Sequence, residues 1–272
     1  MPEFKNLMNS IGRAFADAGI FIGKTVTENY KNIDPDVIRH LSQAPLLSYS
    51  LFVSKRENIE PCEPDGYPPL IFVHGLGGGR GDFLPMSWYL WLLGRKRSYK
   101  IQFEKGQTIS EQAKALANFI RDVKKATEER QVEIVAHSLG GIVARIAITD
   151  HRLGGSIKTL LTLGSPHRGT YPARYANTGV TKEIRPESEL IKKLGEKPLP
   201  KNIRFISFWS RSDLFILPAE SAAAEGAEQI DMTPFTHYSY LIDPESWKRV
   251  GKLLTDATHY QVDVPEKTTE RG

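Results

Sequence analysis

Ten residues near the middle of the chain constrain its fold more than any other segment. Residues 132–141 read Val-Glu-Ile-Val-Ala-His-Ser-Leu-Gly-Gly, an apolar run of strand length that enters a small-x-Ser-x-small turn. A helical stretch from Gly141 to about Asp150 follows at once. A strand that turns this sharply into a helix strains the backbone of Ser138 and exposes its hydroxyl at the end of a sheet. The segment predicts either a nucleophilic serine or an ordinary strand–helix turn.

The positions two residues before and after the serine must be small, because both lie against neighbouring backbone in such a turn. Gly140 meets this demand. Ala136 departs from the commoner glycine by one methyl group, which we expect the site to accommodate.

The rest of the chain alternates short apolar strands with helices. We expect strands at 46–54, 70–73, 98–103, 132–136, 157–163, 203–209 and 228–232, and helices at 83–93, 108–130, 141–150 and 244–257. This alternation predicts the α/β class, with a mostly parallel central sheet flanked by helices on both faces. Thr108 and Glu111 form a capping-box pair at the start of the longest helix. Residues 171–201 lose the strand–helix rhythm.

Composition excludes several classes of protein. The 272 residues suit one large α/β domain, and the single cysteine, Cys62, allows neither an intrachain disulfide nor a four-cysteine zinc site. The net charge of +4 is spread along the chain, with no basic stripe interleaved with aromatic residues, so we expect no nucleic-acid partner. No acidic cluster argues for a structural calcium, and we expect neither a metal nor a cofactor.

The N-terminal region, residues 1–45, reads as two helices. Apolar residues recur at helical spacing through 4–22, which predicts an amphipathic helix. That helix packs either on the domain, on a partner subunit, or on a membrane surface. No apolar h-region of a secretory signal follows the first charges, which predicts a cytoplasmic protein, or a secreted one if the sequence is a mature form.

A serine hydroxyl needs a general base, and the base needs a carboxylate that orients it. Asp213 follows the expected strand 203–209, at the strand end where parallel sheets place their sites. The apolar stretch after it, residues 214–218, argues for a buried acid rather than a solvated turn residue. The rival acids are less suitable, because Asp231 lies within a strand and Asp243 lies beyond the candidate base.

His237 is the candidate base, since it follows Asp213 and lies near a strand end. His167 also follows a strand and is the main competitor. The other candidates are less suitable: His137 adjoins the serine, His74 lies in a glycine-rich loop, and His259 lies in a polar tail.

The oxyanion formed during acyl transfer needs fixed donors. We assign one to the backbone N–H of Leu139, the residue after the serine, and the second to the N–H of Leu76. Leu76 lies in the glycine-rich loop 74–79. This loop resembles a phosphate cradle on its own, but it lacks the Gly-Lys-Ser/Thr of a P-loop and a G-x-G-x-x-G register.

With these residues placed, the chain resembles bacterial lipases and carboxylesterases of the α/β-hydrolase fold, from about Pro69 to Trp247. The resemblance rests on residues 72–78, 135–141 with 143–145, 163–170, 185–190, 213–222 and 237–241, in that order. It implies serine-dependent ester hydrolysis by Ser138, Asp213 and His237, and a cap or lid at about 171–201. Ala136 matches the members that carry Ala-x-Ser-x-Gly.

The sequence thus predicts a carboxylic ester hydrolase of lipase or esterase type, acting on a small-molecule ester or a lipid. The candidate acyl-pocket residues are Phe83, Phe215, Ile216, Leu217 and Phe235. We divide the chain into a helical extension with a first strand (1–60), a hydrolase domain (61–257) and a polar tail (258–272). A thioesterase, an amidase, an acyltransferase or a non-catalytic relic on the same fold is the alternative. The oligomeric state is left open.

Overall fold

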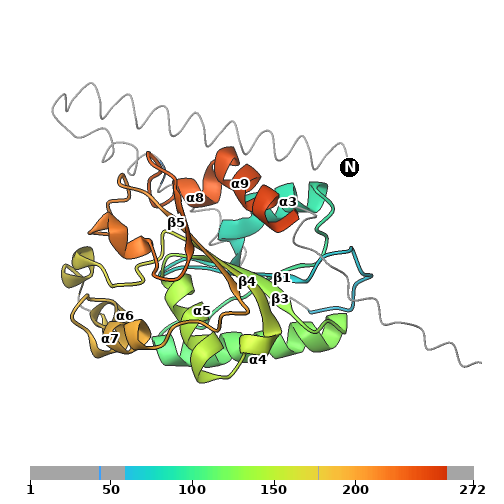
Figure 1. Cartoon of the computed structure of the whole chain (residues 1–272), viewed down its shortest axis with the longest axis horizontal. Coiled ribbons are helices and arrows are strands. Elements are labelled where there is room, and N and C mark those ends of the chain that lie inside the picture. The colour runs from blue at the N-terminus through green and yellow to red at the C-terminus, as the bar shows by residue number, and fades with distance from the viewer. Residues whose placement is uncertain (1–42, 44–58, 177, 256–272) are drawn as a thin grey trace, which may run out of the picture.

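The computed structural model describes Gln43, residues 59–176 and residues 178–255 (Figure 1). The strands are β1 (Leu70–Val73), β2 (Ser98–Lys100), β3 (Val132–His137), β4 (Ile157–Leu163), β5 (Arg204–Trp209) and β6 (Glu228–Asp231). The helices are α3 (Leu84–Leu92), α4 (Ile109–Thr127), α5 (Leu139–Asp150), α6 (Gly179–Glu183), α7 (Glu189–Glu196), α8 (Ser239–Ile242) and α9 (Pro244–Thr255). Short 3₁₀ turns occur at Arg80–Phe83, Gly154–Ser156, Tyr171–Arg174 and Ala219–Ala222.

The six described strands form one sheet in the order β2-β1-β3-β4-β5-β6, and every neighbouring pair is parallel. The chain passes from β1 to the edge strand β2 and then returns to β3 on the other side of β1. The strand order therefore reverses between β1 and β3. In open α/β sheets, ligand sites lie at the carboxyl ends of the strands beside such a reversal.

Helices cover both faces of this sheet. Figure 1 shows α4 and α5 on one face, α3, α8 and α9 on the other, and α6 and α7 to one side. Successive residues of a strand point to opposite faces. Ile71 and Val73 therefore pack in the core cluster beneath α4 and α5, whereas Leu70 and Phe72 pack beneath α3 and α9. All four side chains are fully buried.

These elements confirm the expected α/β class and the sheet with helices on both faces. The expected capping box is also present, since Thr108 Oγ1 accepts from the Glu111 N–H and Glu111 Oε2 accepts from the Thr108 N–H. The expected helices of residues 1–45, the strand 46–54 and the tail 258–272 lie outside the described residues, apart from Gln43. Within the described ranges, no helix combines the length and the apolar character needed to span a membrane.

Candidate active site

Ser138 occupies the turn between β3 and α5, at a strained backbone conformation. Its φ is +55° and its ψ is −126°, a region that side chains rarely adopt and that costs of the order of 1–3 kcal/mol. Because β3 ends at His137 and α5 begins at Leu139, the two elements together impose this conformation on Ser138. As a result the side chain projects at the carboxyl end of β3, next to the strand-order reversal.

Close backbone approach on two sides explains the small residues around this serine. A Cβ at Gly140 would lie 2.5 Å from the carbonyl oxygen of Val73 and 2.7 Å from that of His74. A Cβ at Gly75 would lie 2.8 Å from the Cβ of Ser138. Ala136, by contrast, places its methyl in the buried core cluster beneath α4 and α5. We call Gly75 together with residues 136–141 the serine turn.

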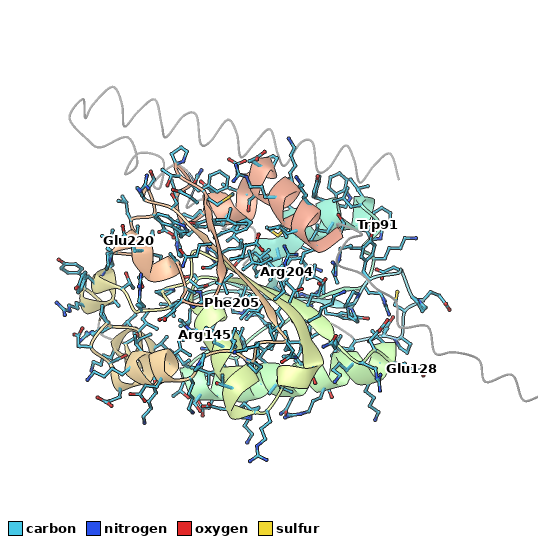
Figure 2. All side chains as sticks on the ribbon, in the orientation of Figure 1. Trp91, Glu128, Arg145, Arg204, Phe205 and Glu220 are labelled. Atoms are coloured by element: carbon cyan, nitrogen blue, oxygen red, sulfur yellow. The ribbon has the colours of Figure 1, made fainter. Side chains whose placement is uncertain are left out.

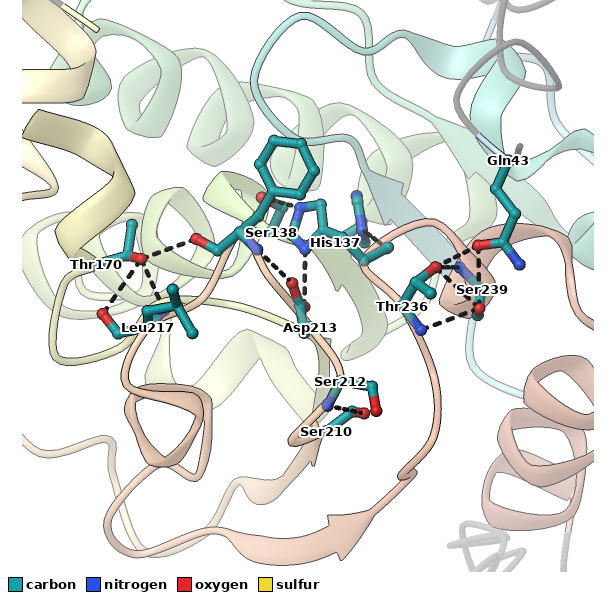
Figure 3. A network of polar contacts seen from close by, with 12 residues as sticks. Gln43, His137, Ser138, Thr170, Ser210, Ser212, Asp213, Leu217, Thr236 and Ser239 are labelled. Carbon is teal, nitrogen blue, oxygen red and sulfur yellow. Dashed lines mark hydrogen bonds and ion pairs between the residues drawn. The ribbon is translucent and has the colours of Figure 1, made fainter. Parts of the chain in front are cut away.

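Three side chains from different parts of the chain meet here in a hydrogen-bonded line (Figure 3). Ser138 Oγ lies 2.9 Å from His237 Nε2, and His237 Nδ1 lies 2.9 Å from Asp213 Oδ2. Asp213 is 1% exposed and acts as an acceptor, so the ring carries its proton on Nδ1. His237 Nε2 is then free to accept a hydrogen bond from the Ser138 hydroxyl. Asp213 Oδ1 also accepts from the Phe215 N–H at 3.0 Å, which orients the carboxylate.

A second histidine holds the backbone of the first. His137 Nε2 donates to the His237 carbonyl at 2.9 Å, and the two ring centroids lie 4.6 Å apart. Burial, and then the charge that His237 carries when protonated, set the pKa of His137 well below its ordinary value. His137 is therefore a neutral structural donor, and it leaves the proton-accepting position to His237.

The glycine-rich loop after β1 is fixed by His74. The Phe103 N–H donates to His74 Nε2 at 3.3 Å, so the ring proton lies on Nδ1 and is donated to the Gly75 carbonyl at 2.9 Å. That carbonyl also accepts from the Gly78 N–H at 3.2 Å. Because C=O and N–H point in opposite directions across a trans peptide, the Leu76 N–H points away from His74.

Leu76 and Leu139 both line the cavity into which Ser138 opens. Leu139 is the first residue of α5, and the first N–H groups of a helix have no acceptor within the helix. The positive end of the helix dipole lies at the same place. The N–H groups of Leu76 and Leu139 are therefore the candidate oxyanion donors at this cavity.

The cavity has a volume of about 520 Å³, which lies in the range of small-molecule sites. Much of its wall is apolar and comes from the segment between β4 and β5. This part of the wall includes Pro166, Pro172, Ala173, Ala176 and Ile184, and Ile216 from the loop after β5 adds to it. Asp82 and Tyr238 add polar groups to the lining, and the phenol pKa of Tyr238 is raised by burial and by Asp213 and Asp82.

Only part of the expected acyl wall lies at this cavity. Phe215 and Ile216 line it, and the Phe215 ring packs 5.1 Å from the His237 ring. Phe83 instead lies in the core, 4.8 Å from the Phe72 ring and fully buried, because the 3₁₀ turn before α3 points it beneath the sheet. Phe235 packs on Tyr240.

Leu217 is absent from the lining, and its backbone explains why. The Leu217 N–H donates to Thr170 Oγ1 at 2.9 Å (Figure 3). The Leu217 carbonyl accepts from the Tyr171 N–H. The side chain is left 37% exposed. Apolar character alone thus did not distinguish pocket from core or surface.

His167, the competing base, lies away from the serine. It is 2% exposed, and its Nε2 lies 3.0 Å from Thr162 Oγ1. Burial, and then the charge of Arg145, lower its pKa well below the ordinary value. Arg145 also lies over the ring of Phe205, and Figure 2 shows these two side chains beside each other. His167 therefore belongs to a buried cluster under α7 and not to the Ser138 site.

The site includes groups that sequence reasoning missed. His137 as a backbone donor, Asp82 and Tyr238 in the cavity, and Gln43 near His237 were not predicted. Tyr238 adjoins His237, so its place in the lining was open to inference, whereas nothing in the sequence pairs Gln43 with residues near 237.

The fold and the site together define the class: the chain has a lipase-like α/β-hydrolase fold. Its fold is similar to that of the mature form of a Bacillus licheniformis lipase, with a TM-score of 0.62, 19% identity, and coverage of 73% of this chain and 96% of that one. The propeptide form of the same lipase gives a TM-score of 0.63 at 19% identity, over 72% of this chain and 52% of that chain. Aspergillus fumigatus lipase B gives 0.61 at 14% identity, over 74% and 55%.

Sequence comparison points to a more particular relationship. Residues 96–221 match the family model of a PGAP1-like alpha/beta domain. The chain is 30% identical over 152 residues to GPI inositol-deacylase B of Yarrowia lipolytica, covering 45% of this chain and 16% of that protein. It is 34% identical over 55 residues to GPI inositol-deacylase of Candida albicans, covering 20% and 14%. The chain thus spans about one sixth of the length of these curated relatives.

Proposed function

We propose that the protein is a serine hydrolase that cleaves carboxylic esters of lipase or esterase type. The observation that carries this proposal is the hydrogen-bonded line Ser138–His237–Asp213 at an apolar cavity. A hydroxyl, a base and an orienting carboxylate in this order are what acyl transfer through a serine requires.

The proposed mechanism follows from the hydrogen bonds. Ser138 Oγ attacks the ester carbonyl while its proton passes to His237 Nε2. Asp213 holds the ring and stabilises the imidazolium, and the N–H groups of Leu76 and Leu139 bind the oxyanion. His237 then gives its proton to the departing alcohol, which leaves an acyl ester on Ser138. Water then attacks that ester and gives a proton to His237, which passes it to Ser138 Oγ as the acid leaves and the free serine is restored.

The test is covalent labelling together with turnover. We expect a fluorophosphonate to label Ser138, and short p-nitrophenyl esters to be hydrolysed. A purified, folded protein that takes no label and turns over no ester contradicts the proposal and favours a relic binding protein. Matched ester, thioester and amide substrates then separate a hydrolase of esters from a thioesterase, an amidase or an acyltransferase.

The apolar wall favours an aliphatic acyl group, and the two curated relatives suggest the alcohol. Both relatives are named as enzymes that deacylate inositol, so an acyl ester of a polyol is the second candidate substrate class. A comparison of the hydrolysis of an acylated inositol with that of a p-nitrophenyl ester of equal chain length distinguishes the two classes.

A series of esters with acyl chains from C2 to C18, measured below and above substrate aggregation, distinguishes an esterase from a lipase. The Ala136-x-Ser138-x-Gly140 turn favours the corresponding bacterial lipase subgroup.

We also propose that residues 171–201 act as a cap, since Pro172, Ala173, Ala176 and Ile184 contribute to the cavity wall. In this proposal the cap is part of the hydrolase domain (61–257), which lies between the extension (1–60) and the tail (258–272).

Apolar side chains near the cavity support contact with a lipid surface. The exposed ones are Leu76, Tyr171, Tyr175, Phe215 and Leu217. We expect Tyr175→Ser, at a side chain that is 94% exposed, to weaken sedimentation with phosphatidylcholine vesicles and to leave hydrolysis of a soluble short ester unchanged. Equal sedimentation of both forms counts against this contact. The amphipathic helix expected at 4–22 lies outside the described residues.

A further inference from the structure

A residue distant in sequence contacts the loop that carries His237. Gln43 lies 193 residues before Thr236, which precedes this histidine, and 196 before Ser239, which lies two positions after it. The Oε1 atom of Gln43 accepts from both hydroxyls, with 3.2 Å to Ser239 Oγ. Figure 3 shows the amide directed at this pair. We call residues 236–239 the histidine loop.

The histidine loop is closed on itself by side-chain hydrogen bonds. The Thr236 N–H donates to Ser239 Oγ at 3.1 Å, and the Ser239 N–H donates to Thr236 Oγ1 at 3.4 Å. Thr236 is 0% exposed and Ser239 is 2% exposed. Both hydroxyl oxygens therefore accept a backbone proton in a place that bulk water does not reach.

Each hydroxyl also carries one proton that needs an acceptor. The two oxygens lie 3.1 Å apart, so one hydroxyl is able to donate to the other, but the second proton then requires a third group. A carbonyl oxygen has two lone pairs and accepts both protons. Gln43 Oε1 meets this need, and its loss leaves a buried donor unsatisfied, which is costly.

We propose that Gln43 is a positioning residue for His237: by accepting the hydroxyl protons of Thr236 and Ser239, it fixes the backbone on both sides of the histidine. This inference rests on the function proposed above, in which His237 is the base. His137 fixes the carbonyl of His237 from the serine side, and Gln43 fixes the flanking residues from the other side. A small displacement of the ring lengthens the 2.9 Å contact to Ser138 Oγ, and proton transfer is sensitive to this distance.

The test compares two substitutions in the full-length chain. Gln43→Leu removes the acceptor at nearly constant size, whereas Gln43→Glu keeps an oxygen with free lone pairs. With a soluble p-nitrophenyl ester, we expect Gln43→Leu to lower kcat by about tenfold with KM within twofold, as expected for an unsatisfied buried donor. Gln43→Glu restores most of kcat. The matched control is Gln229→Leu on β6, where the amide donates to the Ala224 carbonyl, and its kcat stays at the wild-type value.

A combined substitution tests the route of the effect. Thr236→Val together with Ser239→Ala removes both hydroxyls and leaves Gln43 no hydroxyl proton to accept, so adding Gln43→Leu to this pair costs less than Gln43→Leu alone costs in the wild type. Fully additive losses overturn the proposal, as does a Gln43→Leu variant with wild-type kcat or a Gln43→Glu variant as impaired as Gln43→Leu.

Amide hydrogen exchange provides a readout that does not depend on activity. We expect the N–H groups of Thr236 and Ser239 to exchange faster in Gln43→Leu than in the wild type, and unchanged exchange overturns the inference. If the wild type neither takes the fluorophosphonate nor turns over ester, the proposed function fails, and exchange still decides whether Gln43 fixes the loop. If Gln43→Leu does not fold, Gln43→Glu and Thr236→Val carry the same comparison.

Discussion

The serine turn and the histidine loop are held in opposite ways. At the serine turn, Gly75 and Gly140 let backbone segments approach so closely that a Cβ has no room. At the histidine loop, the hydroxyls of Thr236 and Ser239 and the ring of His137 hold the backbone by hydrogen bonds. The serine turn thus depends on two glycines that have no side chain, and the histidine loop depends on polar side chains that form hydrogen bonds. The steric requirement is visible in the sequence as the small residue Gly140 two positions after Ser138, whereas a hydrogen-bond partner can come from anywhere in the chain.

Removing the hydroxyl of Ser138, the proposed nucleophile, tests whether the serine turn and the histidine loop serve one reaction. We expect Ser138→Ala to lower kcat by about 10⁵–10⁶-fold, because the proposed nucleophile is lost while the backbone of both segments is kept. The melting temperature stays nearly unchanged. Turnover by the purified variant near the wild-type rate rules out Ser138 as the nucleophile.

The next test concerns Asp213, the proposed acid that contacts His237. Asp213→Asn keeps the shape of the side chain but presents a group that no longer stabilises the imidazolium and favours the wrong ring tautomer. We expect kcat to fall about 10⁴-fold, with the fold intact. The check is steady-state kinetics together with circular dichroism. Asp231→Asn is the control, since Asp231 is exposed on β6 and its kinetics stay at the wild-type level.

At the serine turn, a larger residue in place of a glycine is expected to lower the stability of the fold as well as the activity. Gly140→Ala brings a methyl to 2.5 Å from the Val73 carbonyl oxygen, so we expect the free energy of unfolding to fall by about 3 kcal/mol. Urea unfolding measures this change. The matched control is Gly155→Ala, where a Cβ meets nothing within 4 Å and the expected change is within about 0.5 kcal/mol. Equal stability of both variants removes the steric account of the serine turn.

The smallest effect concerns pH and the buried histidines. His137 and His167 have pKa values well below the ordinary range in the folded protein, because burial disfavours their charged forms. The unfolded chain regains a pKa of about 6.5, so it binds more protons below that pH. Stability is therefore full above about pH 6.5 and falls as the pH decreases, by up to about 1.4 kcal/mol per pH unit for each histidine.

Urea unfolding at pH 7.5, 6.5 and 5.5 measures this slope. His167→Gln flattens it and leaves the histidine loop untouched, since His167 lies in the separate cluster with Arg145 and Thr162. A slope of zero in the wild type between pH 6.5 and 5.5 means that these histidines are not held neutral by burial.

The same contrast explains what the sequence allowed us to predict. The strands, the parallel sheet and the position of Ser138 follow from local periodicity and from the small residues on either side of the serine. Asp213 and His237 were inferred from chain order and strand ends, and the structure brings them together with Ser138. The roles assigned to these residues remain predictions.

The rest was not accessible, for two physical reasons. Phe83 and Phe235 were placed in the acyl wall because an apolar side chain reads the same in a core as in a pocket, and both pack away from the cavity. Gln43 contacts residues almost 200 positions later, a separation at which no sequence periodicity indicates contact. Hydrogen bonds across such distances depend on the completed fold.

The order of the strands has a consequence for how this protein reaches its native state. Ser138, Asp213 and His237 follow β3, β5 and β6, and the loop with Leu76 follows β1, so no short fragment contains the whole site. Parallel pairing of strands distant in sequence is slow, because loop closure precedes any gain from contact. If Ser138 is the nucleophile proposed above, its labelling counts molecules in which the sheet is complete. We expect its time course during refolding to follow the slowest conformational phase.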